Sequence, residues 1–248
     1  MSEHVITTLE DGVLTVTLNR PDKKNAMTRP MYRALTDAFV RADEDDDIRV
    51  LVWAAEGDSF CAGNDLAGFV AVEDTGEEPP VISLIRSGLS IRKPVVAAVK
   101  GWCVGIGATM MLHVDFIYAE RSAKFKMPFT ELGGVPEAGA TKYLIERFGR
   151  QITAEWLLLS EAIPAERAYD WRMVNEVVDD GMALSRAMET AKRLAALPPL
   201  SMRDTKRLIQ GDYEAVMPLI REEMRIFSER LRSEEMQQVI AARMMGKK

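Results

Sequence analysis

Hydrophobic and polar residues alternate in the first part of the chain in a way that predicts two strands and a helix. Residues 5–9 and 14–18 are rich in β-branched side chains and flank the dipeptide Asp11-Gly12. Such a dipeptide between two apolar runs is typical of a tight β-hairpin. Thr28 then has the side chain of a helix N-cap. Apolar residues recur at helical spacing after it, so we expect a helix to about Ala42.

The middle of the chain alternates short apolar runs with helical patterns. Three runs are typical of buried strands: residues 49–54, 95–99 and 115–119. Residues 81–91 and 101–112 have the pattern of apolar helices, and beyond Gly139 we expect a chain that is almost entirely helical. Strands that alternate with helices predict a parallel sheet with crossover helices, and therefore an α/β protein.

The C-terminal part carries the clearest periodic pattern, which we interpret as one last helix. Apolar residues follow each other three or four positions apart: Met217, Ile220, Met224, Phe227 and Leu231, continued more loosely by Met236, Ile240 and Met244. This stripe fits a helix packed on its own domain, and it equally fits a helix packed against a partner subunit. The spacing alone leaves both open.

Composition narrows the class of protein. Of the 248 residues, 47% are apolar and 28% are charged, and the net charge of −6 argues against a nucleic-acid partner. The longest stretch without Asp, Glu, Lys or Arg, residues 101–114, is too short to cross a membrane. The two cysteines cannot form a disulfide framework, and the N-terminus lacks the pattern of a secretory signal. We therefore expect a cytoplasmic protein without nucleic-acid or membrane partners.

The chemistry cannot depend on many imidazoles, because the sequence has only His4 and His113. Metal sites that use several histidines are excluded, and we expect no metal. His113 lies within an apolar run, and we interpret it as a packed side chain.

Two glycine-containing loops are candidates for binding an oxygen atom of a ligand. Residues 60–66 read FCAGNDL, and residues 101–107 read GWCVGIG; each follows a predicted strand and precedes a helix. Glycine allows a backbone N–H to point at a ligand, and two such groups that converge on one oxygen form an oxyanion hole. The alternative is that both loops are simply tight turns.

Glu137 and Glu131 are the candidate acid–base residues. Glu137 lies among small and apolar residues just before a predicted helix, where desolvation raises the pKa of a carboxyl group and suits it to act as a base. Its alternative role is to complement the dipole of that helix. Glu131 has the same chemistry in more polar surroundings, so the residues alone do not decide between them.

From about Val5 to Met245 the chain resembles the crotonase superfamily, the enoyl-CoA hydratases and isomerases. The residues that carry the resemblance are LNRPDKKNAM at 18–27, FCAGNDL at 60–66 and residues 97–115, in this order and spacing. The resemblance implies a spiral of repeated β-β-α units over residues 1–197. Residues 198–248 would form a helical region that covers the acyl-CoA and serves oligomerisation. It also implies a homotrimer or a dimer of trimers.

The resemblance also assigns roles to individual residues. The backbone N–H groups of Asn64 and Ile106 would hold the thioester oxygen of an acyl-CoA, and Glu137 falls where the peroxisomal-type 3-enoyl-CoA/2-enoyl-CoA isomerases carry their single base. Contacts to the CoA part of the substrate are expected from five residues: Lys24, Ala26, Ala62, Asp65 and Leu66. Arg20 and Lys23, together with Lys24, are candidate cations for the CoA phosphates.

The reaction implied is isomerisation of 3-enoyl-CoA to 2-enoyl-CoA through an enolate, with one glutamate as proton shuttle and no cofactor beyond the CoA of the substrate. Hydratases of this family use two glutamates, and the matching positions here are Thr109 and Phe129, which cannot accept a proton. The alternatives are another reaction of the family, namely hydration, thioester hydrolysis or a dehalogenase-like substitution, or a non-catalytic acyl-CoA-binding protein.

Overall fold

Strands and helices alternate along most of the computed structural model, which describes residues 2–65 and 78–246. The larger sheet has the order β1-β2-β3-β4-β6-β9, and all its neighbouring strands are parallel except β1 and β2. Its strands are β1 (Val5–Glu10), β2 (Val13–Leu18), β3 (Val50–Ala55), β4 (Val95–Val99), β6 (Phe116–Glu120) and β9 (Glu176–Val178). A smaller sheet has the order β5-β7-β8 and is formed by β5 (Trp102–Val104), β7 (Lys124–Lys126) and β8 (Ala162–Pro164).

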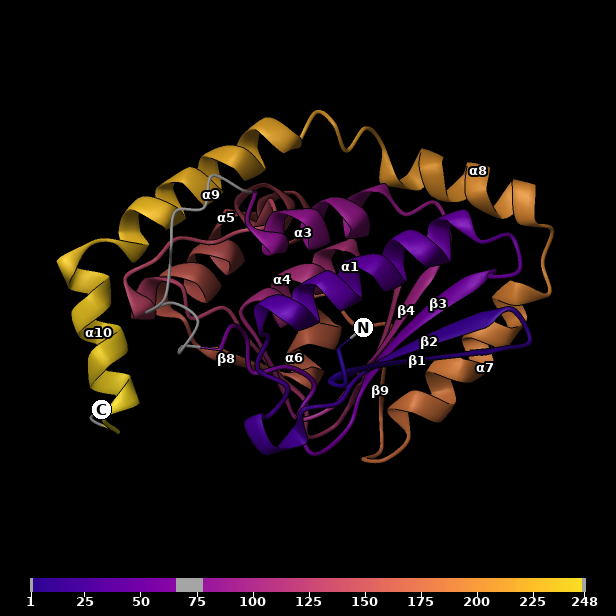
Figure 1. Cartoon of the computed structure of the whole chain (residues 1–248), viewed down its shortest axis with the longest axis horizontal. Helices are drawn as coiled ribbons and strands as arrows, with labels where there is room; N and C mark the ends of the chain where they lie inside the picture. The colour runs from indigo at the N-terminus through magenta and orange to yellow at the C-terminus, as the bar shows by residue number, and fades with distance from the viewer. Residues whose placement is uncertain (1, 66–77, 247–248) are drawn as a thin grey trace.

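Helices cover the larger sheet on both faces and extend beyond it (Figure 1). The helices of the first half are α1 (Arg29–Glu44), α3 (Pro80–Ser90) and the short α4 (Ile106–Met110). Those of the second half are α5 (Ala140–Leu159), α6 (Ala165–Asp170), α7 (Ala183–Ala195), α8 (Pro199–Gln210), α9 (Met217–Leu231) and α10 (Glu234–Met244). Three 3₁₀ turns complete the order: η1 (Pro21–Lys23), η2 (Met111–His113) and η3 (Thr130–Leu132). In Figure 1, α8 and α9 follow one edge of the molecule and α10 turns away at the end far from α8.

The alternating side chains of β3 show how the sheet is sandwiched. Leu51, Trp53 and Ala55 belong to the main core with α1 and α3, whereas Val50 and Val52 belong to a second core beneath α7. All six residues of β3 are buried, because successive side chains of a strand point to opposite faces and both faces are covered here. The expected α/β class is confirmed.

Local sequence signals placed the first elements correctly. The hairpin of β1 and β2 turns at Asp11 and Gly12, whose φ angles of 50° and 76° are those of a type I′ turn. The side chain of Thr28 accepts a hydrogen bond from the backbone N–H of Met31, which confirms the expected N-cap of α1. The helix ends at Glu44, two residues beyond the expected end.

Three expectations for the later chain were wrong in detail. The segment expected as a helix over 101–112 begins instead with strand β5, because its backbone pairs with β7. The region beyond Gly139 is not wholly helical, since β8 and β9 add short strands to the two sheets. The expected last helix is two helices, and Ser233 caps the second one by accepting a hydrogen bond from the N–H of Met236.

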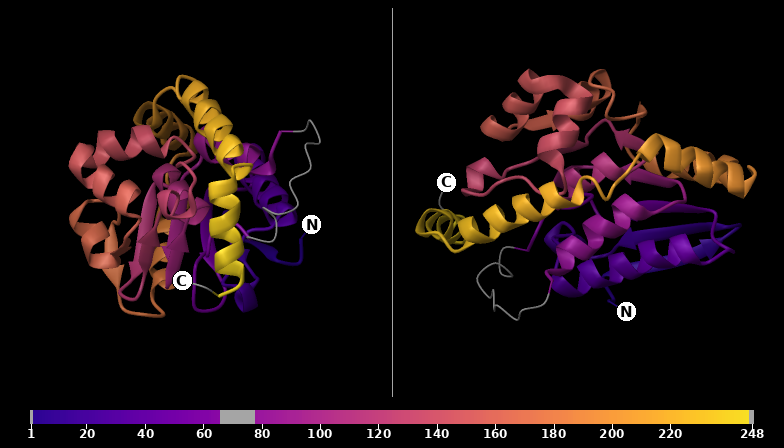
Figure 2. Two further views of the ribbon diagram at one scale, coloured as in Figure 1. Left: turned by 90° about the vertical axis from the view of Figure 1, so that its left-hand side faces the viewer. Right: turned by 90° about the horizontal axis from the view of Figure 1, so that it is seen from above.

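The C-terminal apolar stripe packs on its own chain. All its residues from Met217 to Ile240 are buried in the main core, and Met244 is exposed. Figure 2 (right) shows α9 lying between α1 and α3 on one side and the α5 region on the other. Among residues 2–65 and 78–246, no helix is long and apolar enough to cross a membrane.

Candidate active site

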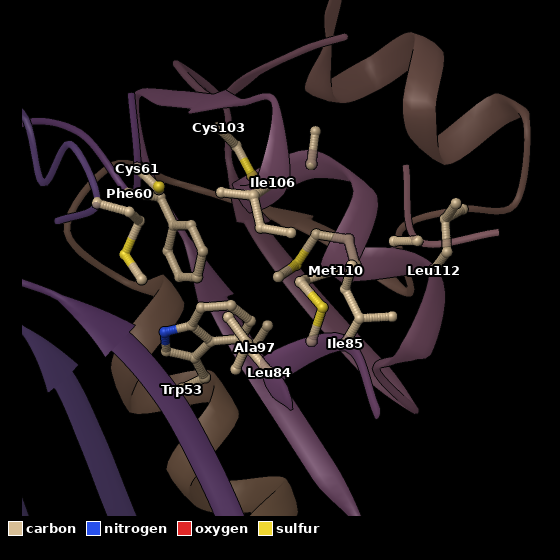
Figure 3. Close-up of a cluster of buried hydrophobic side chains, with 14 of the residues drawn as sticks. Trp53, Phe60, Cys61, Leu84, Ile85, Ala97, Cys103, Ile106, Met110 and Leu112 are labelled. Carbon is tan, nitrogen blue, oxygen red and sulfur yellow. The ribbon is translucent and has the colours of Figure 1, made fainter. Parts of the chain in front are cut away.

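The two glycine-containing loops lie side by side because their backbones form a short parallel ladder. The amide of Cys61 donates to the carbonyl of Trp102 at 2.9 Å, and the amide of Val104 donates to the carbonyl of Cys61 at 2.8 Å. Figure 3 shows Phe60, Cys61, Cys103 and Ile106 at one end of the buried cluster that also contains Trp53. This ladder fixes the distance between the loops, so neither is a turn that moves independently.

Asn64 and Ile106 end up in the wall of one cavity of about 130 Å³. Ile106 is the first residue of α4, where helical backbone N–H groups have no partner within the helix. Within residues 2–65 and 78–246, the backbone N–H groups of Asn64 and Ile106 donate to no backbone carbonyl. The structure thus brings into one cavity wall the two amides that the resemblance assigns to an oxyanion hole.

Glu137 lies in the turn between η3 and α5, with only 1% of its surface exposed. It lines a second cavity of about 340 Å³, and Asn64 lines this cavity too. Its Oε1 atom has no hydrogen-bond partner in the described part of the chain. Burial, and then the charge of Glu223, raise the pKa of Glu137 from 4.5 to about 8.

Glu131 is not placed for acid–base chemistry. Its carboxylate pairs with the ammonium of Lys126 at 2.6 Å and with the guanidinium of Arg243. Burial by itself raises the pKa of Glu131, but the hydrogen bond from Lys126 and the charge of Arg243 outweigh it, and the pKa lies below its usual value. Glu131 therefore stays ionised and links α10 to β7.

The positions that hydratases of the resembling family fill with glutamates hold groups without a titratable proton. Thr109 is buried in α4, and its hydroxyl faces the carbonyl of Ile106 at 3.4 Å. Phe129 is buried and lines the same cavity as Asn64 and Ile106. No second carboxylate therefore occupies these two points.

The segment expected to bind CoA packs against the first glycine loop. The amide of Ala62 donates to the carbonyl of Lys24 at 2.9 Å, and the carbonyl of Ala26 accepts from the Arg20 guanidinium at 3.0 Å. The same guanidinium contacts Asp65 at 2.7 Å. Arg20 and Asp65 thus join the two segments, and Arg20 is not a free cation.

The side chains of Lys23 and Lys24 are exposed beside this junction. They remain candidates for the phosphates of CoA. Leu66 lies outside the described residues.

Sequence reasoning missed three side chains around Glu137. Tyr32 lines the cavity with Glu137, and its hydroxyl donates a hydrogen bond to Oδ1 of Asn64. His113 and Glu223 contact the backbone just after Glu137. Tyr32 has the spacing of an ordinary core residue of α1, and Glu223 only adjoins the apolar stripe of α9, so the sequence pattern carried no specific signal for either.

Comparisons with known proteins agree with this geometry. Residues 8–244 match the family described as Enoyl-CoA hydratase/isomerase. The chain is 36% identical over 219 residues to the 1,2-epoxyphenylacetyl-CoA isomerase of Escherichia coli (strain K12), covering 85% of this chain and 83% of that protein. It is 32% identical over 228 residues to enoyl-CoA delta isomerase 2 of Rattus norvegicus, covering 90% of this chain and 58% of that longer protein.

Solved structures show the same fold over nearly the whole chain. The crystal structure of an enoyl-CoA hydratase/isomerase from Pseudoalteromonas atlantica T6c superposes with a TM-score of 0.94 at 36% identity, over 99% of this chain and 98% of that one. OdaA of Pseudomonas aeruginosa gives 0.94 at 37% identity, over 98% and 99%. The repeated strand–helix units, the two paired loops and these matches together show that the chain belongs to the enoyl-CoA hydratase/isomerase family, with the crotonase fold.

Proposed function

We propose that the protein isomerises 3-enoyl-CoA to 2-enoyl-CoA with Glu137 as the only acid–base group. The observation that carries this proposal is the buried carboxylate of Glu137, whose Oε1 has no hydrogen-bond partner in the described part of the chain and which lies in a cavity that it shares with Asn64. Moving the double bond from C3=C4 to C2=C3 needs only one base, because the proton removed from C2 is the proton returned at C4. Addition of water by the two-glutamate route lacks both of its side chains at Thr109 and Phe129.

Each group has a defined part in this reaction. The amides of Asn64 and Ile106 donate hydrogen bonds to the thioester oxygen, whose negative charge grows as the enolate forms. Glu137 in its ionised form accepts the proton from C2, and the electron pair of the C–H bond moves into the enolate. The carboxylic acid then protonates C4, and the new double bond is conjugated with the thioester. Its raised pKa makes Glu137 a stronger base than an exposed glutamate.

The test is a rate measurement with 3-hexenoyl-CoA, followed by the ultraviolet absorbance of the conjugated product. Glu137→Gln keeps the size of the side chain and removes the base, so we expect the rate to fall by roughly 10²–10⁴ while a saturated acyl-CoA still binds. An unchanged rate in Glu137→Gln excludes this mechanism. Binding of acyl-CoA without turnover in the parent supports a non-catalytic protein instead.

A second candidate reaction is the isomerisation of 1,2-epoxyphenylacetyl-CoA, favoured by the 36% identity to the protein named for it. Both reactions use a thioester gripped through its oxygen, but the ring epoxide is bulky and rigid. Parallel assays with 3-hexenoyl-CoA and the epoxide, together with water-addition and CoA-release controls, identify the preferred reaction.

We also propose assembly as a homotrimer or a dimer of trimers. The exposed apolar residues Leu200, Leu208 and Ile209 on α8 support a subunit contact there. Light scattering of the parent and of Ile209→Glu tests this proposal, and a monomeric parent excludes it.

A further inference from the structure

The backbone directly after Glu137 takes a conformation that is unfavourable for Ala138 and that glycine adopts freely at the next position. Ala138 has a φ of 62° and Gly139 a φ of 71°, both in the left-handed region. For an alanine this conformation is strained, and such strain persists only when the surroundings hold it. The Oε1 atom of Glu137 has no partner of its own in the described chain, so its direction depends on how this turn is held.

His113 holds the turn from one side. Its Nε2 lies 2.9 Å from the carbonyl oxygen of Ala138. Because a carbonyl only accepts, Nε2 carries the proton and donates. Burial lowers the pKa of His113 to about 4, so the ring is neutral at physiological pH. The ring also packs edge-on against Tyr143, with 5.2 Å between centroids, which fixes its orientation.

Glu223 holds the turn from the other side, and it comes from helix α9. Its carboxylate accepts from the amide of Gly139 at 2.7 Å and from the amide and hydroxyl of Thr141 at 3.2 and 2.5 Å. These bonds cap the start of α5, whose own N-cap residue, Gly139, has no side chain to do so. Taken alone, these hydrogen bonds of Glu223 would show only that it caps helix α5.

Helix α9 has a second relationship to the site, however. Met224, Phe227 and Leu231, which follow Glu223 on the same helix, line the cavity that contains Glu137. The docking of α9 therefore closes one wall of the cavity and, through Glu223, fixes the backbone that carries the base.

We propose that His113 and Glu223 are positioning residues for the reaction, which grip the backbone of residues 138–141 from two sides and so aim the carboxylate of Glu137 at the substrate. This inference rests on the proposed role of Glu137 as proton shuttle. It assigns to the C-terminal helix a part in the chemistry besides covering the substrate.

The first test is Glu223→Gln. The amide of glutamine has one accepting oxygen, so its NH₂ group faces an N–H donor and half of the grip is lost. We expect kcat for 3-hexenoyl-CoA to fall roughly tenfold to a hundredfold, as a small misplacement of a catalytic group does. The affinity for butanoyl-CoA, which measures the cavity and the oxyanion amides, stays within about twofold.

A pH profile separates positioning from mere capping. The charge of Glu223 raises the pKa of Glu137, whereas burial raises the pKa of Tyr32 well above its usual value and that of Cys61 to about 12, so these two groups keep their protons near neutral pH. Asp65 and Arg29 line the same cavity as Glu137. The parent kcat/KM rises with pH to a midpoint near 8, because the base must be ionised. Removing the negative charge of Glu223 lowers the pKa of Glu137, so the midpoint moves to lower pH.

Glu222→Gln is the matched control. This residue precedes Glu223 on α9 and is paired with Arg225 on the surface. We expect no change in kcat, affinity or midpoint. The proposal for Glu223 is wrong if Glu223→Gln keeps kcat within about threefold of the parent, or if its midpoint does not move.

The second test separates the hydrogen bond of His113 from its bulk. His113→Leu removes the donor, whereas His113→Gln places an N–H donor at a similar reach to Nε2. We expect a loss of kcat in the leucine variant and recovery of most of it in the glutamine variant. Equal rates in the two variants overturn the role of His113.

Exchange of the C2 protons of butanoyl-CoA in D₂O, followed by mass spectrometry, distinguishes failure of this inference from failure of the proposed function. Exchange needs only the base and the oxyanion amides. If the parent exchanges the C2 protons but does not isomerise 3-hexenoyl-CoA, the proposed function is wrong. The exchange rates of the variants then test whether His113 and Glu223 position Glu137. If the parent isomerises 3-hexenoyl-CoA and the variants of both tests above have parental rates, the positioning roles of His113 and Glu223 are wrong and the proposed function stands. A parent that does neither contradicts both.

Discussion

The hydroxyl of Tyr32 in α1 donates a hydrogen bond to the side-chain oxygen of Asn64, the residue whose backbone amide we propose as one of the two oxyanion donors. Burial, and then the charge of Glu137, raise the pKa of Tyr32 well above its usual value, so the phenol keeps its proton and acts only as a donor. Helix α1 thereby holds the loop of residues 60–64 through the side chain of Asn64.

We predict that Tyr32→Phe lowers activity without unfolding the protein. The ring stays in the core, but Oδ1 of Asn64 loses its donor and the loop gains freedom. The expected loss is about tenfold in kcat, in line with small displacements of oxyanion donors. Circular dichroism checks the fold, and steady-state kinetics with 3-hexenoyl-CoA measures the loss. Parental kinetics in Tyr32→Phe would show that the loop is held without this bond.

The buried carboxyl group of Glu137 predicts an unusual dependence of stability on pH. Its pKa is about 8 in the folded state and near 4.5 when exposed, so between these values the folded state binds more protons than the unfolded state. Stability contributed by this group is therefore lost as pH rises from about 4.5 to about 8. Glutamine at this position cannot ionise, so the variant does not lose stability in this way.

Glu137→Gln should accordingly be more stable than the parent at pH 9, by an amount on the order of a few kcal/mol, with a difference that vanishes below pH ~4.5. Urea denaturation at several pH values measures both curves. Glu131→Gln is the control, because the pKa of that carboxyl group is lowered and the sign of its effect is opposite. Parallel curves for the parent and Glu137→Gln would mean that the carboxyl is solvated.

The sequence predicted the elements whose signals are local. The Asp11-Gly12 turn and the Thr28 cap depend on side chains and φ angles within a few residues, and both are present as expected. Strands β8 and β9 were not predicted, because each is three residues long and exists only by pairing with a strand distant in sequence. A run of three residues is too short to show the alternating hydrophobic pattern or the β-propensity by which a strand is predicted.

The candidate site divides in the same way. The residues alone made Glu137 and the two loops candidates and left alternatives open, and the family resemblance assigned Glu137 and the amides of Asn64 and Ile106. The contacts of Glu223 to Gly139 and of Tyr32 to Asn64 join residues 84 and 32 positions apart, so only the packed structure reveals them. The residue type of Glu223 did not indicate its burial either, because a glutamate in a helix is ordinarily exposed.

The two candidate glutamates are distinguished by a direct comparison of activity. Glu131 is held by Lys126 and Arg243, outside the group of residues that line the Glu137 cavity. We predict that Glu131→Gln keeps the rate of isomerisation within about threefold of the parent, whereas Glu137→Gln loses it. The ultraviolet assay with 3-hexenoyl-CoA measures both variants. Loss of activity in Glu131→Gln with an intact fold would instead make it a second acid–base residue.

The closeness of the two loops makes Gly107 the sharpest position for a steric test. A Cβ atom there would lie 2.8 Å from Cβ and 3.2 Å from Sγ of Cys61, in the neighbouring loop. Helix propensity alone favours Gly→Ala by about 1 kcal/mol, but this contact forces α4 away from residues 60–64. The amide of Ile106 then moves relative to that of Asn64.

We therefore predict that Gly107→Ala costs about 1–3 kcal/mol of stability and at least roughly tenfold in kcat. Gly88→Ala in α3 is the matched control: its Cβ would lie 2.5 Å from Cε of Met110, the end of a flexible side chain that can rotate away. That variant should retain parental kinetics, because no loop of the site has to move. Thermal denaturation and steady-state kinetics compare the two variants. Equal stability and equal kcat would show that the backbone ladder between residues 60–64 and 102–106 adjusts as easily as a methionine side chain.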